Sequence, residues 1–92
     1  MEHIDGANEN RDVKLYALST CPFCRKVKAL LKKHDVAYDY VDVDLQSREE
    51  RKRLRMELIK YNPRCSYPTL VVDGDTVVIG YREERIEEVL GV

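Results

Sequence analysis

The sequence predicts one small α/β domain, and its length, its alternating patterns and its first βαβ unit support this prediction. The chain has 92 residues, of which 43% are hydrophobic, which suits a single domain with one core. Strand-like and helix-like patterns follow one another in the order βαβ, α, ββ, α. The first unit implies a parallel pair of strands joined by a right-handed crossover.

The N-terminal segment differs from the rest of the chain. Residues 1–12 show no apolar period, and we expect them to form a flexible tail, with the folded domain covering residues 13–92. Residues 13–18 alternate and then become wholly apolar, which is typical of a strand buried on both faces.

A helix is predicted from Pro22 to about His34. Apolar side chains recur at offsets of three and four residues, which places them on one helical face. We expect Phe23 to anchor the start of this helix in the core, with a contact to a substrate as the alternative. His34 closes the helix, where the dipole stabilises a cation, and this indicates a structural role for it.

Residues 38–45 alternate between apolar and acidic side chains and are predicted to form the second strand. A helix is predicted over residues 47–61, because Ser47 and Glu50 form a capping-box signature at its start. Its basic residues are interleaved with glutamates, which favours a solvated helix face over a nucleic-acid surface.

Residues 69–80 contain two β-branched runs around Asp73 and Gly74, a pattern typical of a β-hairpin. A last helix is predicted over residues 82–90, with Ile86, Val89 and Leu90 facing inward.

The charge balance excludes several functional classes. The net charge is −1 although 36% of the residues are charged, so no overall field favours nucleic acid or an anionic membrane. No apolar run approaches the roughly 18 residues of a membrane span. The polar, acidic N-terminus does not resemble a secretory signal, and we expect a cytoplasmic protein that acts as a monomer.

The chain contains three cysteines, Cys21, Cys24 and Cys65. A structural zinc site needs about four Cys or His ligands, and a second pair is missing. A disulfide between Cys21 and Cys24 would close almost no loop and would stabilise the fold little. A redox pair remains as the interpretation that fits the sequence best.

The predicted position of Cys21 favours its reactivity. It lies just before the first turn of a helix, where unpaired N–H groups and the helix dipole favour the thiolate form. Pro22 suits the first helical position, because a donor is not needed there. Cys24 lies one turn inside and is expected to be more buried. We therefore predict that Cys21 attacks a disulfide and that Cys24 resolves the mixed disulfide.

With a cysteine pair at the start of its first helix, the chain resembles the glutaredoxins of the thioredoxin-fold superfamily. The resemblance covers about residues 13–91 and depends on "CPFC", "YPTLVVDG" and "GYREE" in this order. It implies a thioredoxin-like α/β fold: a four-stranded mixed sheet of order 2-1-3-4 flanked by about three helices. "GYREE" also resembles the equivalent stretch of NrdH-type redoxins, which take electrons from a reductase protein.

The resemblance also implies a substrate-docking loop. The Tyr67–Pro68 bond is expected to be cis, and the backbone of Tyr67 is expected to pair with the chain of the substrate. Four further residues are expected to contact glutathione or a protein partner: Gly80, Tyr81, Arg82 and Glu83. The expected partners are protein disulfides, together with glutathione or a donor like thioredoxin reductase.

Two departures from the glutaredoxin pattern bear on the electron donor. Leu18 stands where glutaredoxins usually have a lysine, and Ile79 stands at the first position of their Gly-Gly pair. We therefore expect glutathione to be a poor reductant. Cys65 should lie near the rim of the site, either as a small loop residue or as an accessory thiol. No obligatory cofactor or metal is expected; the alternative function is a dimeric carrier of a [2Fe–2S] cluster.

Overall fold

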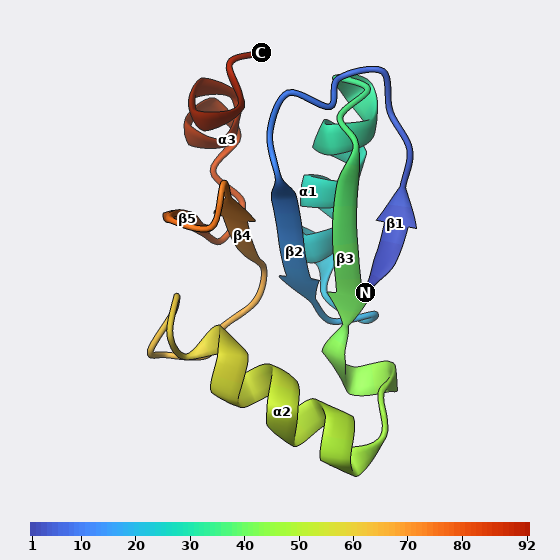
Figure 1. Ribbon diagram of the computed structural model, residues 1–92, viewed down its shortest axis with the longest axis vertical. Helices are drawn as coiled ribbons and strands as arrows, with labels where there is room; N and C mark the ends of the chain where they lie inside the picture. Colours follow the sequence, from blue (N-terminus) through green and yellow to red (C-terminus); the bar gives the residue numbers. More distant parts are fainter.

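A five-stranded mixed sheet forms the centre of the protein (Figure 1), with its strands in the order β1-β3-β2-β4-β5. The computed structural model describes residues 1–92. The strands are β1 (Glu2–Ile4), β2 (Val13–Ala17), β3 (Tyr38–Asp42), β4 (Thr69–Val72) and β5 (Thr76–Ile79). β2 and β3 are parallel, and the other neighbouring strands are antiparallel.

Three α-helices and one short 3₁₀ helix accompany the sheet. They are α1 (Pro22–Lys33), η1 (Val43–Leu45), α2 (Arg48–Leu58) and α3 (Glu83–Leu90). None of these helices is long and apolar enough to cross a membrane. The order predicted for four strands is confirmed in β3-β2-β4-β5, and β1 is an additional edge strand.

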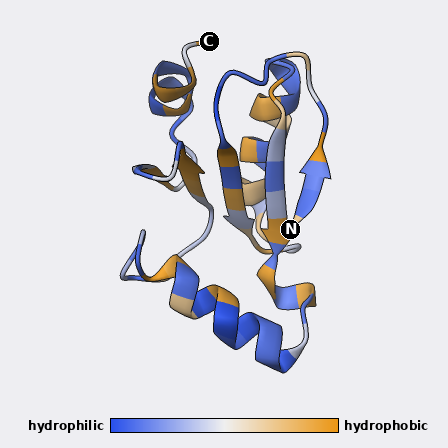
Figure 2. Ribbon diagram, viewed as in Figure 1, coloured by the Kyte–Doolittle hydropathy of each residue, from blue (hydrophilic) through white to orange (hydrophobic).

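The central strands are buried on both faces, as the wholly apolar pattern predicted. Leu15 of β2 and Leu70 of β4 contribute to a cluster of 14 buried residues beneath α1 and α3. The neighbouring residues Tyr16 and Val71 point to the other face, into a cluster of six buried residues beneath α2. We call these the first and the second cluster. Apolar residues are concentrated on the central strands, whereas α2 is mostly hydrophilic (Figure 2).

The structure corrects the prediction that residues 1–12 form a flexible tail outside the folded domain. Glu2–Ile4 form β1, which pairs with β3, and all three of its residues are exposed. A Cβ atom on Gly6 would lie 2.5 Å from the carbonyl oxygen of Asp35, so the following turn passes closely over the end of α1. The sequence pattern missed this strand because it is held by main-chain pairing, which requires no apolar period.

Two predicted boundaries also change. The second strand ends at Asp42 rather than at residue 45, because η1 turns Val43 into the second cluster and leaves Leu45 67% exposed. The second helix ends at Leu58 rather than at residue 61, ahead of a loop that contains Pro63.

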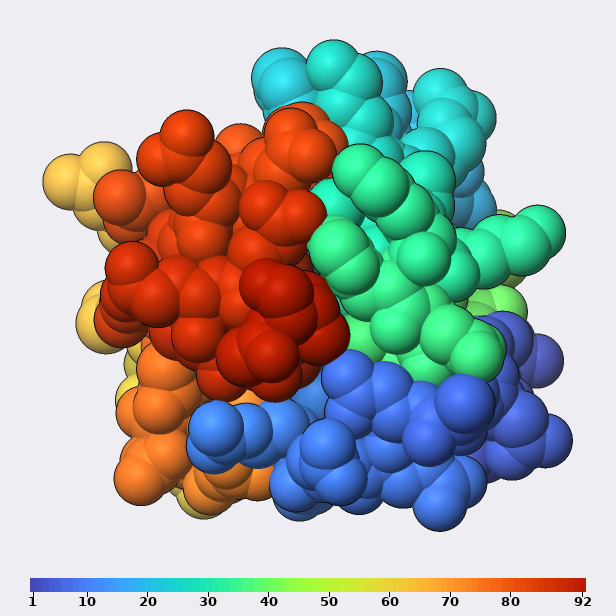
Figure 3. All heavy atoms as spheres, turned by 90° about the horizontal axis from the view of Figure 1, so that it is seen from above, coloured from blue at the N-terminus to red at the C-terminus, as the bar shows by residue number.

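The ends of α1 and α3 lie side by side (Figure 3). His34 is the C-terminal cap of α1, and its Nε2 lies 2.7 Å from a carboxylate oxygen of Glu87 on α3. This contact joins α1 to α3, which agrees with the structural role expected for His34.

Candidate active site

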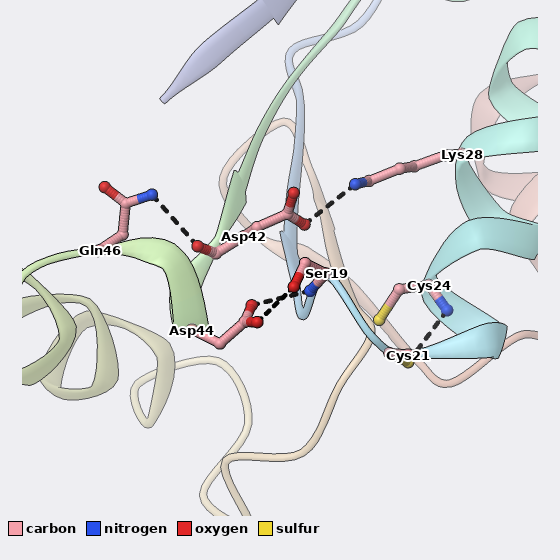
Figure 4. A network of polar contacts seen from close by, with 7 residues as sticks. All are labelled: Ser19, Cys21, Cys24, Lys28, Asp42, Asp44 and Gln46. Carbon is pink, nitrogen blue, oxygen red and sulfur yellow. Dashed lines mark hydrogen bonds and ion pairs between the residues drawn. The ribbon is translucent and has the colours of Figure 1, made fainter.

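Cys21 is the N-terminal cap of α1, at the end of the loop that follows β2. Its sulfur accepts a hydrogen bond of 3.1 Å from the backbone N–H of Cys24 (Figure 4). Pro22 occupies the first helical turn, as predicted. This bond holds the sulfur of Cys21 at the N-terminal end of the helix, where backbone N–H groups lack helical partners.

Cys24 is in a very different environment from Cys21. It is 0% exposed and belongs to the first cluster, whereas Cys21 is partly exposed. Burial, followed by the contact with Cys21, raises the pKa of the Cys24 thiol to about 12. The predicted difference in burial is confirmed. One sulfur is accessible to a substrate, and the other is held as a protonated thiol behind it.

Phe23 does not anchor the helix in the core, and that prediction was wrong. Its side chain is 56% exposed. The inward positions of the first turns belong to Cys24 and Val27 instead, so Phe23 is rotated out of the buried stripe. The ammonium of Lys26 lies 5.6 Å from the centre of the Phe23 ring and 5.8 Å from that of Tyr81. The rings of Phe23 and Tyr81 therefore both lie near the ammonium of Lys26, close to the start of α1.

The loop before β4 is held from two directions. The Tyr67–Pro68 bond is cis, as the resemblance implied. The carbonyl of Pro68 accepts a hydrogen bond of 2.9 Å from the backbone N–H of Gly80, which connects this loop to the end of β5. The buried amide of Asn62 donates to the hydroxyl of Thr69 at 3.0 Å.

Tyr67 lies between the two clusters and packs against both. Burial and then the neighbouring Cys65 raise the pKa of Tyr67 to about 12. Cys65 is half-buried with a left-handed backbone (φ 53°), and it packs against the second cluster, whereas Cys24 belongs to the first. Cys65 therefore lies beside the loop that contains the cis proline, but on the opposite face of the sheet from Cys24.

A groove of about 450 Å³ opens beside this loop on the α2 side. It is lined by Leu18, Val43, Asp44, Arg51, Arg55, Cys65 and Tyr67. The sequence analysis treated the arginines of α2 as part of a solvated face. Their spacing of four residues, which places Arg51 and Arg55 on the same side of the helix, was the signal that could have indicated a shared site.

Two carboxylates, one at the end of β3 and one in η1, contact the segments on either side of the cysteines (Figure 4). Asp44 accepts hydrogen bonds from the hydroxyl and from the backbone N–H of Ser19, the latter at 2.8 Å, and these bonds lower the pKa of Asp44. Asp42 forms an ion pair of 3.0 Å with Lys28 of α1. The sequence analysis assigned neither contact, because both aspartates only continued the alternating strand pattern.

The remaining predicted residues lie after β5. Tyr81 packs against the first cluster, and burial followed by the nearby Glu83 raises its pKa. The carbonyl of Arg82 accepts the first helical hydrogen bond of α3, from Ile86 at 2.9 Å. No group of three or more His, Cys, Asp or Glu side chains is arranged to hold a metal ion.

Similarity to known proteins covers the part of the chain that contains these residues. A sequence model described as glutaredoxin matches residues 13–77, which include both cysteines and the cis-proline loop. A glutaredoxin-like protein of 8.6 kDa from the rubredoxin operon of Clostridium pasteurianum, itself uncharacterized, is 29% identical over 82 residues. That alignment covers 85% of this chain and 96% of the relative.

Two crystal structures are similar over nearly the whole domain. The glutaredoxin of Methanosarcina mazei has a TM-score of 0.90 at 35% identity, covering 99% of this chain and 87% of that one. The methanoredoxin of Methanosarcina acetivorans has a TM-score of 0.85 at 36% identity, covering 88% and 85%.

Proposed function

Because the chain belongs to the glutaredoxin family, we propose that it is a dithiol thiol–disulfide oxidoreductase whose reactive pair is Cys21 and Cys24. The difference between the two sulfurs carries this proposal. Cys21 is partly exposed and accepts an N–H bond, and Cys24 is fully buried three residues later. An accessible sulfur beside an N–H donor suits attack, and a buried thiol suits resolution.

The reaction proceeds in two exchanges that balance electrons and protons. The thiolate of Cys21 attacks one sulfur of a substrate disulfide, and the other substrate sulfur leaves as a thiolate. The Cys24 thiol transfers its proton to this leaving group, and its sulfur attacks Cys21. The bond between Cys21 and the substrate breaks, the second substrate thiolate takes a proton from water, and the Cys21–Cys24 disulfide remains. A donor then returns two electrons.

The substrate docks along the loop that contains the cis proline. In this proposal the backbone of Tyr67 pairs with the extended chain of the substrate. Gly80, Tyr81, Arg82 and Glu83 form the adjoining rim, because the Gly80–Pro68 hydrogen bond holds this segment against the loop. We place this activity in the cytoplasm, where a reducing environment keeps the thiols of the pair available.

We propose a reductase protein as the better electron donor and glutathione as the poorer one. Arg51 and Arg55 offer cations to a carboxylate at the α2 groove, where Leu18 supplies none. At the other rim, the first turn of α3 carries Glu83 and Glu84, which repel a second carboxylate. Glutathione carries a carboxylate at each end and an ammonium beside one of them. Glu83 and Glu84 attract this ammonium but repel the carboxylate next to it, so only the other carboxylate meets cations alone.

Steady-state turnover of one disulfide substrate with each donor tests this proposal. We expect faster turnover with NADPH and thioredoxin reductase than with glutathione and glutathione reductase. Leu18→Lys should raise the glutathione-driven rate about tenfold, by one charge-assisted contact, and leave the reductase-driven rate unchanged. Efficient glutathione-driven turnover of the unmodified protein would show that the donor assignment is wrong.

A further inference from the structure

We propose that the ammonium group of Lys28, held in place by Asp42, is a positioning element that favours the thiolate form of Cys24 when the mixed disulfide is resolved. This inference rests on the proposed function of the cysteine pair. It adds a residue outside the CPFC motif to the second exchange and leaves the first exchange unchanged.

The position of Lys28 on α1 supports this role. It follows Cys24 by four residues, so the two side chains lie on the same side of the helix, one turn apart. Figure 4 shows both side chains pointing from α1 toward the end of β3. An ammonium at this position lies on the side of the helix that faces the sheet, where the sulfur of Cys24 is also buried.

The ammonium is held by two groups of β3. Its nitrogen lies 3.0 Å from a carboxylate oxygen of Asp42 and 4.3 Å from the centre of the Tyr40 ring. The side chains of Lys28 and Asp42 are only 26% and 15% exposed. Partial burial reduces screening by solvent, so the charge of Lys28 acts over a longer distance than that of a free surface lysine.

The second exchange requires this help because Cys24 must lose its proton inside the core. In the reduced protein, burial and the contact with Cys21 both raise the pKa of Cys24. Once Cys21 is bonded to the substrate, its sulfur carries no charge and no longer opposes ionisation. Burial then remains as the main obstacle. The backbone of Leu18 and then the charge of Lys28 lower the pKa of Cys24, and Lys28 is the charged side chain of the two.

Several groups around the ammonium of Lys28 interact with its positive charge. Asp42 and Tyr40 approach it from β3, Asp44 of η1 responds to its charge, and Cys24 lies on its own helix. Asp42 weakens the positive field but fixes its position. The proton lost by Cys24 goes to the first substrate thiolate, and the new sulfur–sulfur bond replaces the bond between Cys21 and the substrate, as in the proposed reaction.

A rapid-quench experiment separates the two exchanges. The reduced protein is mixed with a glutathionylated peptide, and the mixed disulfide is followed by mass spectrometry at several pH values. In Lys28→Met we expect an unchanged rate of formation and resolution about three- to tenfold slower, with the pH profile of resolution shifted to higher pH, because a thiolate without its cation forms less readily. Lys28→Arg should restore most of the rate. Lys32→Met, an exposed lysine of the same helix, is the control and should change nothing.

Resolution at the unmodified rate in Lys28→Met, or slowing by the same factor at every pH without rescue by arginine, would overturn the proposal. A second measurement is independent of turnover. In a Cys21→Ser, Cys65→Ser background, the alkylation rate of Cys24 should fall about three- to tenfold when Lys28→Met is added. Equal rates there would reject the role of Lys28 even if the protein proved inactive with disulfides, whereas a fall without any mixed disulfide in the first experiment would reject the proposed function alone.

Discussion

The sheet is covered by α1 and α3 on one face and by α2 on the other, and the two faces bury very different amounts of apolar material. The first cluster contains 14 buried residues, and the second contains six. Cys24 belongs to the larger cluster, while Cys65 packs against the smaller one. Arginines and an aspartate line the groove on the α2 face.

This difference separates two requirements of disulfide exchange. The resolving sulfur needs a rigid, dry position, so that it stays protonated and correctly placed until the first exchange is complete. Recognition of a charged substrate or donor needs exposed side chains that adjust to a partner. In this protein the face with the larger cluster holds Cys24, the resolving sulfur in our proposal. The face with the smaller cluster borders the charged groove in which we expect recognition.

The largest expected effect is a difference in activity between variants of Cys21 and Cys65, which pack against the first and the second cluster. Cys21→Ser should lower disulfide-reductase activity at least about a hundredfold, because the attacking sulfur is lost. Cys65→Ser should stay within about twofold of the unmodified protein, since its sulfur contributes to neither exchange. Steady-state rates with one disulfide and one donor check both variants. Comparable losses in the two variants would assign Cys65 to the reaction and contradict the separation of the faces.

A second prediction compares the stability of the two clusters. Leu31 of the first cluster and Leu58 of the second are both 0% exposed. We expect Leu31→Ala to lower the free energy of unfolding by about 4 kcal/mol and Leu58→Ala by about 2–3 kcal/mol, because the thinner layer under α2 collapses more readily onto a cavity. Chemical denaturation of both variants measures the difference. The reverse order would show that α2 is the more rigidly packed layer.

The smallest effect is expected at the edge of the sheet. A chain that begins at Asp12 loses β1 and the ion pair between Arg11 and Asp73, which lie at the surface. Exposed contacts of this kind contribute little, and we expect the Tm to fall by only a few degrees. His3→Ala, which removes the contact of His3 with Asp39, is a milder control. A loss of cooperative melting in the truncated chain would show that the segment is part of the core fold.

Sequence patterns predicted the buried parts of the protein well, because burial leaves a period in the residues. The alternation in β2 and the spacing of Cys21 and Cys24 located the central strand and the pair at the start of α1. The edge strand β1 left no such period, since its side chains are exposed. Phe23 was misplaced because Cys24, itself a small hydrophobic residue, takes the inward position.

Sequence patterns did not predict the groove and its polar contacts, for a different reason. Arg51 and Arg55 have the spacing of any solvated helix, and only the packing of α2 against the sheet brings them beside Leu18 and Cys65. The contact between Lys28 and Asp42 likewise joins a helix and a strand 14 residues apart in the chain. The cis bond at Pro68 was implied by the family resemblance, because the local sequence alone does not determine it.

The division of roles between the two sulfurs of the motif is tested most directly by trapping the intermediate. The Cys24→Ser protein is incubated with a peptide disulfide, and the products are digested without reductant and mapped by mass spectrometry. We predict a stable mixed disulfide on Cys21, because attack requires only this sulfur and resolution requires the missing one. An adduct found mainly on Cys65, or none on Cys21, would contradict the account.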